Sequence, residues 1–142
     1  MSGTVRVVAA VFQAGSQVLA CKRKPEKAAG GKWEFPGGKV EPGESAEEAL
    51  RRELIEELDV RIKAVGGLIW RETTTDSNSS IDLACYWVEP DAVPTSSTDH
   101  DELRWCFVEE LGQLDFAEAD KPIVRELERI ETDSGSMSKT EG

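Results

Sequence analysis

The sequence predicts an α/β/α sandwich, a mixed β-sheet that lies between helices. Runs rich in β-branched residues occur in both halves of the chain, and two longer segments with helical periodicity, one early and one late, accompany them. Two helices on opposite faces of such a sheet make this fold. At 142 residues the chain has the length of one domain. We expect that domain at residues 1–131, and a disordered tail of serine, glycine and charged residues at 132–142.

The first half begins with two strands. Residues 4–13 (TVRVVAAVFQ) and 17–23 (QVLACKR) are apolar or β-branched runs, and Ala14-Gly15-Ser16 between them predicts a hairpin or a tight connection. A basic loop that contains glycine follows at residues 24–32.

A helix is predicted from Ser45 to about Leu58. Ser45 is a suitable N-cap, and Glu48 stands at the capping-box position three residues later. Leu50, Leu54 and Leu58 lie on one face, so this face is expected to pack against the sheet.

The second half alternates strand patterns with polar connections and ends in a helix. Strands are predicted at residues 60–71, 81–88 and 103–107, a polar connection at 72–80, and a second long helix at 117–130.

The composition excludes several function classes. The net charge of −11 and the lack of a basic patch argue against binding to long nucleic acid. No apolar run approaches the roughly 20 residues of a membrane span, and no signal-peptide pattern is present, so we expect a cytoplasmic protein without a membrane partner. Cys21, Cys85 and Cys106 lie scattered in apolar segments and are expected to be buried thiols.

Residues 37–60 concentrate eight carboxylates beside three basic residues. At about 100° per residue, Glu53, Glu56 and Glu57 fall on one arc of the helix next to its leucine face. A solvated acidic face is the simpler interpretation. The preceding glycine loop and the i, i+3, i+4 spacing favour instead a site for Mg²⁺ or Mn²⁺, cations that let an acidic protein hold a phosphate-rich substrate.

The same segment resembles a known signature. From Gly38 the chain reads glycine, five residues, Glu44, seven residues and then RELIEELDV, which resembles the Nudix box of the Nudix hydrolases. Only Asp59 departs from the pattern, which has glycine just past the helix; aspartate is among the few residues that tolerate a left-handed conformation there. The order of elements over about residues 4–131 also resembles the Nudix fold.

The resemblance implies hydrolysis of a nucleoside diphosphate linked to another group, with divalent ions on the phosphates. Glu53 would be the general base, and Glu44 and Arg52 would form the pair that orients the loop and helix. The metal ligands that it implies are a backbone carbonyl of Gly37 or Gly38 and the carboxylates of Glu53, Glu56 and Glu57.

Outside the box, GKWEFPGGKVEPGES resembles MutT-type nucleoside triphosphate pyrophosphohydrolases and their cytidine-nucleotide relatives. In that group a carboxylate six residues before a tryptophan joins the metal site, which here is Asp99 before Trp105. His100 is then expected to be a neighbouring loop residue and not a catalyst. Arg23 matches a phosphate-contacting arginine, and a strand-end surface charge is the alternative.

The nucleobase is read, in the enzymes that the chain resembles, just before a proline that starts the last helix, where this chain has Asp120. A carboxylate suits the amino group of cytosine or the ring N–H of oxidised guanine, and both choices stay open. Glu34, Arg71 and Asp120 resemble the cytidine-directed relatives and favour pyrimidines slightly. A helix cap is the structural alternative for Asp120.

These observations predict a Mg²⁺-dependent pyrophosphohydrolase, with Mn²⁺ as a substitute, that converts a nucleoside triphosphate to monophosphate and pyrophosphate. Its expected role is to clear 8-oxo-dGTP, CTP, dCTP or modified cytidine triphosphates, as a monomer or homodimer. Hydrolysis of nucleotide sugars or dinucleotides is the second hypothesis. A non-catalytic nucleotide-binding module is less favoured, because none of the three box glutamates is missing.

Overall fold

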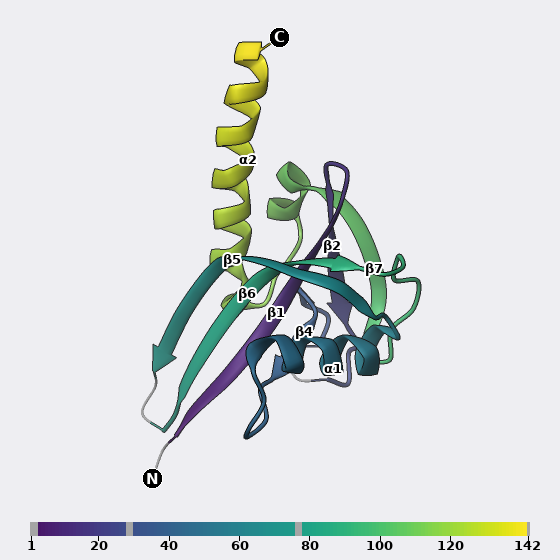
Figure 1. Ribbon diagram of the computed structural model, residues 1–142, viewed down its shortest axis with the longest axis vertical. Coiled ribbons are helices and arrows are strands. Elements are labelled where there is room, and N and C mark those ends of the chain that lie inside the picture. Colours follow the sequence, from purple (N-terminus) through teal and green to yellow (C-terminus); the bar gives the residue numbers. More distant parts are fainter. Residues whose placement is uncertain (1–2, 28–29, 76–77, 142) are drawn as a thin grey trace.

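The computed structural model describes residues 3–27, 30–75 and 78–141, with side chains up to residue 131. Its strands form one mixed sheet, with helix α1 against one face and helix α2 against the other (Figure 1). The strands are β1 (Thr4–Ala14), β2 (Gln17–Arg23), β3 (Trp33–Glu34), β4 (Gly37–Lys39), β5 (Ile62–Thr75), β6 (Ser80–Pro90) and β7 (His100–Phe107). The helices are α1 (Ala46–Leu58), α2 (Lys121–Glu141) and two short 3₁₀ helices, Val108–Gln113 and Glu118–Asp120. The predicted α/β/α sandwich is confirmed.

The sheet opens between β1 and β2, and this opening positions the site. The order is β3-β2-β1-β6-β5, with β1 parallel to β6. The register of β1 with β2 is confined to the hairpin end, at Gln13 and Ala14. Farther from the turn, β4 pairs with β1, and the Ala10 N–H donates to the Pro36 carbonyl at 2.8 Å. The glycine loop therefore enters the sheet where β1 and β2 diverge.

Alternation along β1 divides the core into two clusters, as strand geometry requires. Ala9 and Val11 face the cluster that includes Ile123 and Leu127 of α2. Val8, Ala10 and Phe12 face the cluster that holds the α1 leucines at positions 50, 54 and 58. The predicted apolar face of α1 is thus buried, and its acidic side lies at the edge of this cluster. Cys21, Cys85 and Cys106 are buried free thiols, as expected.

Helix α1 is capped at both ends by local interactions. Ser45 and Glu48 form the predicted capping box. Asp59 adopts the left-handed conformation, with φ 53° and ψ 42°, and its N–H donates to the Ile55 carbonyl at 3.0 Å. Asp59 therefore adopts the left-handed conformation that suits the glycine of the family pattern, and the helix still ends at Leu58 as predicted.

Several boundaries differ from those predicted. The expected strand at 60–71 extends to Thr75, and β6 and β7 are also longer than expected; of the connection predicted at 72–80, residues 76–77 lie outside the described part. Strands β3 and β4 were not predicted, since two and three residues are too few to show a pattern. The second helix begins at Lys121, after a 3₁₀ turn, and its backbone continues to Glu141. Side chains beyond residue 131 are outside the described part, and the disordered tail stays a prediction.

Among the described helices, none is both long and apolar enough to cross a membrane.

Candidate active site

The glycine loop packs closely against both the acidic side of α1 and strand β1, with no space for a side chain at Gly37 or Gly38. A Cβ at Gly38 would lie 2.4–2.6 Å from the Glu53 carboxylate, and a Cβ at Gly37 would lie 2.0 Å from the Val8 carbonyl oxygen. Only glycine allows these approaches. The structure therefore brings Gly38 against Glu53 and Gly37 against the backbone of β1.

Arg52 links the loop to the helix. Its Nε and Nη2 donate to the two carboxylate oxygens of Glu44 at 2.8 and 2.9 Å, and Nη2 also donates to the Lys39 carbonyl at 2.9 Å. Its Nη1 donates to Glu53 Oε1 at 3.0 Å and to Glu56 Oε2 at 3.3 Å. The Arg52 bonds to Glu44, followed by the bond from the Glu41 N–H, lower the pKa of Glu44 to about 2. The predicted Glu44–Arg52 pair is formed, and it holds one oxygen of Glu53.

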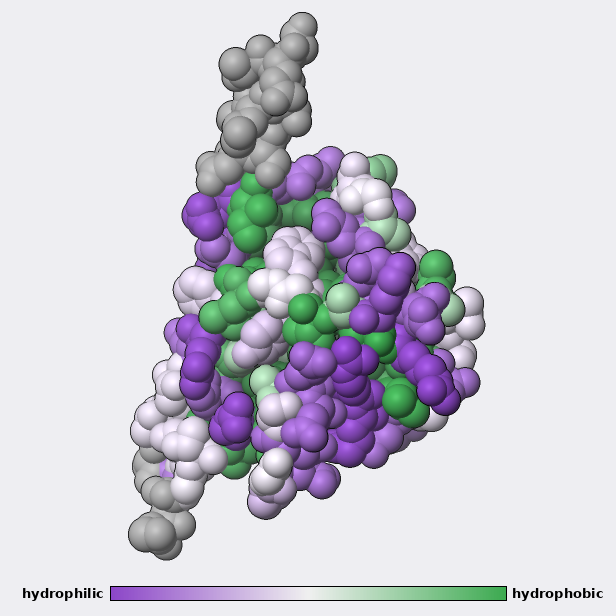
Figure 2. All heavy atoms as spheres, in the orientation of Figure 1, coloured by the Kyte–Doolittle hydropathy of each residue, from purple (hydrophilic) through white to green (hydrophobic). Residues whose placement is uncertain are grey.

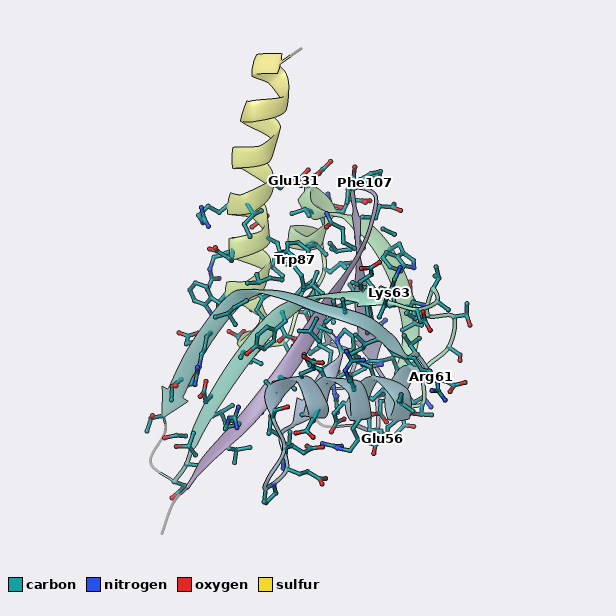
Figure 3. The ribbon with its side chains drawn as sticks, viewed as in Figure 1. Glu56, Arg61, Lys63, Trp87, Phe107 and Glu131 are labelled. Atoms are coloured by element: carbon teal, nitrogen blue, oxygen red, sulfur yellow. The ribbon has the colours of Figure 1, made fainter. Side chains whose placement is uncertain are left out.

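The three box glutamates differ in environment. Glu57 is only 5% exposed, whereas the side chain of Glu56 is 59% exposed and lies on the outer side of α1 (Figure 3). Burial raises the pKa of Glu57 to about 9, and the negative charges of Glu53, Glu34 and Asp99 add to the increase. Burial also raises the pKa of Glu53, against the effect of Arg52. Figure 2 shows hydrophilic side chains gathered over the region where α1 lies in Figure 1.

The environment of one Glu57 oxygen indicates whether these residues suit a divalent cation. Glu57 Oε2 is buried, and none of the residues that the structure describes forms a hydrogen bond with it. A buried polar atom without a partner is costly. A carboxylate oxygen among further carboxylates is the donor set that hard divalent cations prefer. The residues fit such an ion, and Glu57 is the centre of the candidate metal site.

Asp99 reaches this site through a loop that docks on the end of α1. The Thr98 N–H donates to the Glu57 carbonyl at 2.9 Å, and the Lys24 N–H donates to the Asp99 carbonyl at 3.1 Å. Lys27 Nζ lies 3.3 Å from Asp99 Oδ1. Asp99 is near enough to raise the pKa values of both Glu53 and Glu57. The structure thus brings Asp99 to the predicted ligands.

His100 and Glu34 form a buried connection that the sequence analysis did not anticipate. His100 is 4% exposed; its Nε2 lies 2.8 Å from Glu34 Oε2 and its Nδ1 lies 2.7 Å from Ser97 Oγ. Arg23 Nη1 donates to the same Glu34 oxygen at 3.0 Å. The link depends on the register of β2 with β7, which pairs Arg23 with His100. In the sequence, the one feature that could have indicated this link is that the single histidine directly follows Asp99.

Asp120 lies close enough to Glu34 to be affected by its charge. It is buried, its Oδ2 accepts from the Phe35 N–H at 3.3 Å, and burial followed by the charge of Glu34 raises its pKa to about 7. Two backbone bonds of 2.9 Å join Trp33 to residues 115 and 117 and hold this segment against β3. A cavity of about 280 Å³ adjoins the residues before Asp120. It is lined by Glu72, Thr74, Ile81, Leu83, Glu118 and Ala119.

Arg71 does not join Arg23, Glu34 and Asp120. Its guanidinium binds Asp82 through Nε at 3.1 Å and Nη2 at 2.7 Å. It lines a small cavity with Ala46 and Tyr86, at the start of α1. The structure therefore separates Arg71 from Asp120, while it unites Arg23, Glu34 and Asp120.

A glycine loop that faces an acidic helix in an α/β/α sandwich has the donor set that suits divalent cations. Residues 3–127 match the model of the NUDIX domain. The chain belongs to the Nudix family, whose hydrolases generally need a divalent metal, and MutT structures share its fold. The prediction of a MutT-type Nudix hydrolase is confirmed.

Named relatives extend over most of the chain. It is 38% identical over 121 residues to the CTP pyrophosphohydrolase of Escherichia coli, which covers 84% of this chain and 88% of that protein. It is 34% identical over 125 residues to a Mycobacterium tuberculosis protein provisionally named 8-oxo-dGTP diphosphatase 2, with 87% of both chains covered. The solution structure of the Escherichia coli ORF135 protein superposes with a TM-score of 0.77 at 32% identity, covering 92% of each chain.

Proposed function

We propose that the protein is a divalent-metal-dependent pyrophosphohydrolase that converts a nucleoside triphosphate and water to a nucleoside monophosphate and pyrophosphate. The observation that carries the proposal is the buried Oε2 of Glu57, which lies near the charges of Glu53 and Asp99 and has no hydrogen-bond partner among the described residues. Similarity to a CTP pyrophosphohydrolase over 84% of the chain supports the same reaction. The activity would remove modified or surplus nucleotides from the pool, in the cytoplasm, as a monomer or homodimer.

The metal is proposed to be Mg²⁺, with Mn²⁺ as a substitute. Its proposed ligands are the carboxylates of Glu53, Glu56, Glu57 and Asp99 and a carbonyl of Gly37 or Gly38. When bound, the cation neutralises phosphate charge and lowers the pKa of the attacking water. The protein could then hold a triphosphate in spite of its net charge of −11.

Glu53 is the proposed general base. Arg52 holds its Oε1 at 3.0 Å, and Gly38 leaves space for the carboxylate beside the loop. In this arrangement Glu53 accepts the proton of the water that attacks phosphorus, while the anhydride bond between the α- and β-phosphates breaks and the nucleoside monophosphate and pyrophosphate separate. Arg23, at the end of β2, is the proposed phosphate contact; its Nη1 is oriented by Glu34.

Asp120 is the residue proposed to recognise the base. Because its pKa is about 7, the protonation state of its carboxyl group, and with it the preferred base, should change near neutral pH. An ionised carboxylate only accepts hydrogen bonds and suits the amino group of cytosine. A protonated carboxyl also donates, and so can pair with the ring N–H and the neighbouring carbonyl oxygen of oxidised guanine. We favour cytidine triphosphates, and 8-oxo-dGTP is the second candidate, supported by similarity to the Mycobacterium tuberculosis protein.

The test is pyrophosphate release with Mg²⁺ from CTP, dCTP, 5-methyl-dCTP, dGTP and 8-oxo-dGTP, compared by kcat/KM. Dominant turnover of cytidine nucleotides supports the first candidate, and a preference for 8-oxo-dGTP of about a hundredfold over dGTP supports the second. Nucleotide sugars and dinucleotides belong in the same panel. If only these are cleaved, without pyrophosphate, the proposed reaction is wrong.

A further inference from the structure

A second group of possible metal ligands adjoins the proposed catalytic site. One donor atom from each of Glu34, Glu57 and His100 lies within 4.8 Å of the other two. These residues come from β3, α1 and β7, so the fold and not a local motif brings them together. Glu57 and His100 are each at least nine-tenths buried, and the Glu34 side chain is 17% exposed.

Two of the three donors have the outer partners that metal ligands usually have. Ligating histidines as a rule use the second ring nitrogen in a hydrogen bond, and ligating carboxylates are hydrogen-bonded in turn. His100 Nδ1 lies 2.7 Å from Ser97 Oγ, which itself accepts from the Asp99 N–H at 3.2 Å. Glu34 Oε2 accepts from Arg23 Nη1 at 3.0 Å. The histidine ring and the carboxylate are therefore both oriented from outside.

Glu57 supplies the donor of this group that the described residues leave without a hydrogen bond. His100 Nε2 lies 2.8 Å from Glu34 Oε2; this contact is a hydrogen bond when the ring carries its proton on Nε2, and it offers two lone pairs to an ion when the proton is on Nδ1. Three converging donors, one of them a buried carboxylate with an unsatisfied oxygen, can bind one ion.

We propose that Glu34, Glu57 and His100 form a binding site for a divalent transition-metal ion such as Mn²⁺ or Zn²⁺, distinct from the Mg²⁺ site and sharing Glu57 with it. The imidazole nitrogen selects the metal, because Mg²⁺ prefers oxygen ligands whereas Mn²⁺ and Zn²⁺ accept imidazole. The inference rests on the proposed function for the role of Glu57. Occupancy of this site would tie the activity to the supply of transition metal.

Pulsed EPR of bound Mn²⁺ tests the site directly. Because His100 is the only histidine of the chain, protein produced with ¹⁵N-histidine and without an affinity tag gives an unambiguous assignment. We expect ¹⁴N modulation from a coordinated imidazole, converted to the ¹⁵N pattern by labelling. The H100Q variant keeps a side-chain N–H toward Glu34 but removes the imidazole. It should lose the nitrogen modulation and, when excess Mg²⁺ fills the oxygen-ligand site, bind Mn²⁺ at least about tenfold more weakly, with Mg²⁺ affinity unchanged.

The matched control is D101N, which changes an exposed charge next to His100 and should behave as the wild type. Thermal unfolding shows whether H100Q is folded. If Mn²⁺ binds and pyrophosphate is released but no nitrogen modulation is seen, the histidine site is refuted and the proposed function stands. If the protein neither binds Mn²⁺ nor releases pyrophosphate from any triphosphate, the proposed function fails as well.

Discussion

Replacing Glu57 by glutamine should stabilise the protein when divalent metal is absent. The pKa of Glu57 is about 9 in the folded chain, against an ordinary value of 4.5 in the unfolded chain. The folded state therefore keeps a proton that the unfolded state releases. The stability associated with this proton is complete below about pH 4.5 and is lost progressively as the pH rises toward 9. Glutamine resembles the protonated side chain at every pH and avoids this loss.

The size of the effect follows from the pH interval. Between pH 4.5 and pH 7 the unfolded state gains about 1.4 kcal/mol per pH unit from ionisation of Glu57, or about 3 kcal/mol in all. For a chain of this length that difference corresponds to about 10 °C in Tm. Glu57 is nearly fully buried, so screening by solvent reduces the figure little.

The assay is thermal unfolding followed by circular dichroism, in EDTA, from pH 5 to pH 9. Wild type and E57Q should nearly coincide at pH 5 and separate as the pH rises, with E57Q the more stable. E56Q is the matched control, since the Glu56 side chain is 59% exposed and should change Tm little. Added Mg²⁺ should stabilise the wild type and narrow the gap. The reasoning is refuted if E57Q is less stable than the wild type at pH 8, or if both have the same pH dependence.

Three further predictions concern the other parts of the site. In G38A the new methyl group displaces the Glu53 carboxylate, so kcat should fall about a hundredfold while Tm changes little; unchanged kcat would show that Glu53 need not lie against the loop. R52K cannot span both oxygens of Glu44 and the Lys39 carbonyl, and kcat/KM should fall on the order of 10- to 100-fold, measured as pyrophosphate release; wild-type kinetics would remove Arg52 from the orienting role. In the wild type, the ratio of kcat/KM for dCTP to that for 8-oxo-dGTP should rise with pH around pH 7, because Asp120 ionises there. In D120N this ratio should not depend on pH. A ratio that varies with pH equally in both proteins would exclude Asp120 as the reader of the base.

The local parts of this fold could be read from the sequence, and the long-range parts could not. The capping box at Ser45, the leucine face of α1 and the left-handed Asp59 depend on spacings of a few residues, and each is found as predicted. The contact between His100 and Glu34 joins residues 66 positions apart and depends on the register of β2 with β7 and with β3. Periodicity carries no information about such a register. Arg71 shows the same limit: a strand pattern did not reveal that its partner is Asp82 on the neighbouring strand.

Glu34 is the residue at which the phosphate side and the base side of the site meet. It accepts hydrogen bonds from Arg23 and lies against His100, on the side of the metal ligands. Its charge also raises the pKa of Asp120, the proposed reader of the base, and that of Glu57. Removing this charge by E34Q should therefore lower both of these pKa values and weaken the hold on Arg23. Arg52 and Asp120 each act on one side only, so E34Q should change metal affinity and base preference together, whereas R52K and D120N should change them separately.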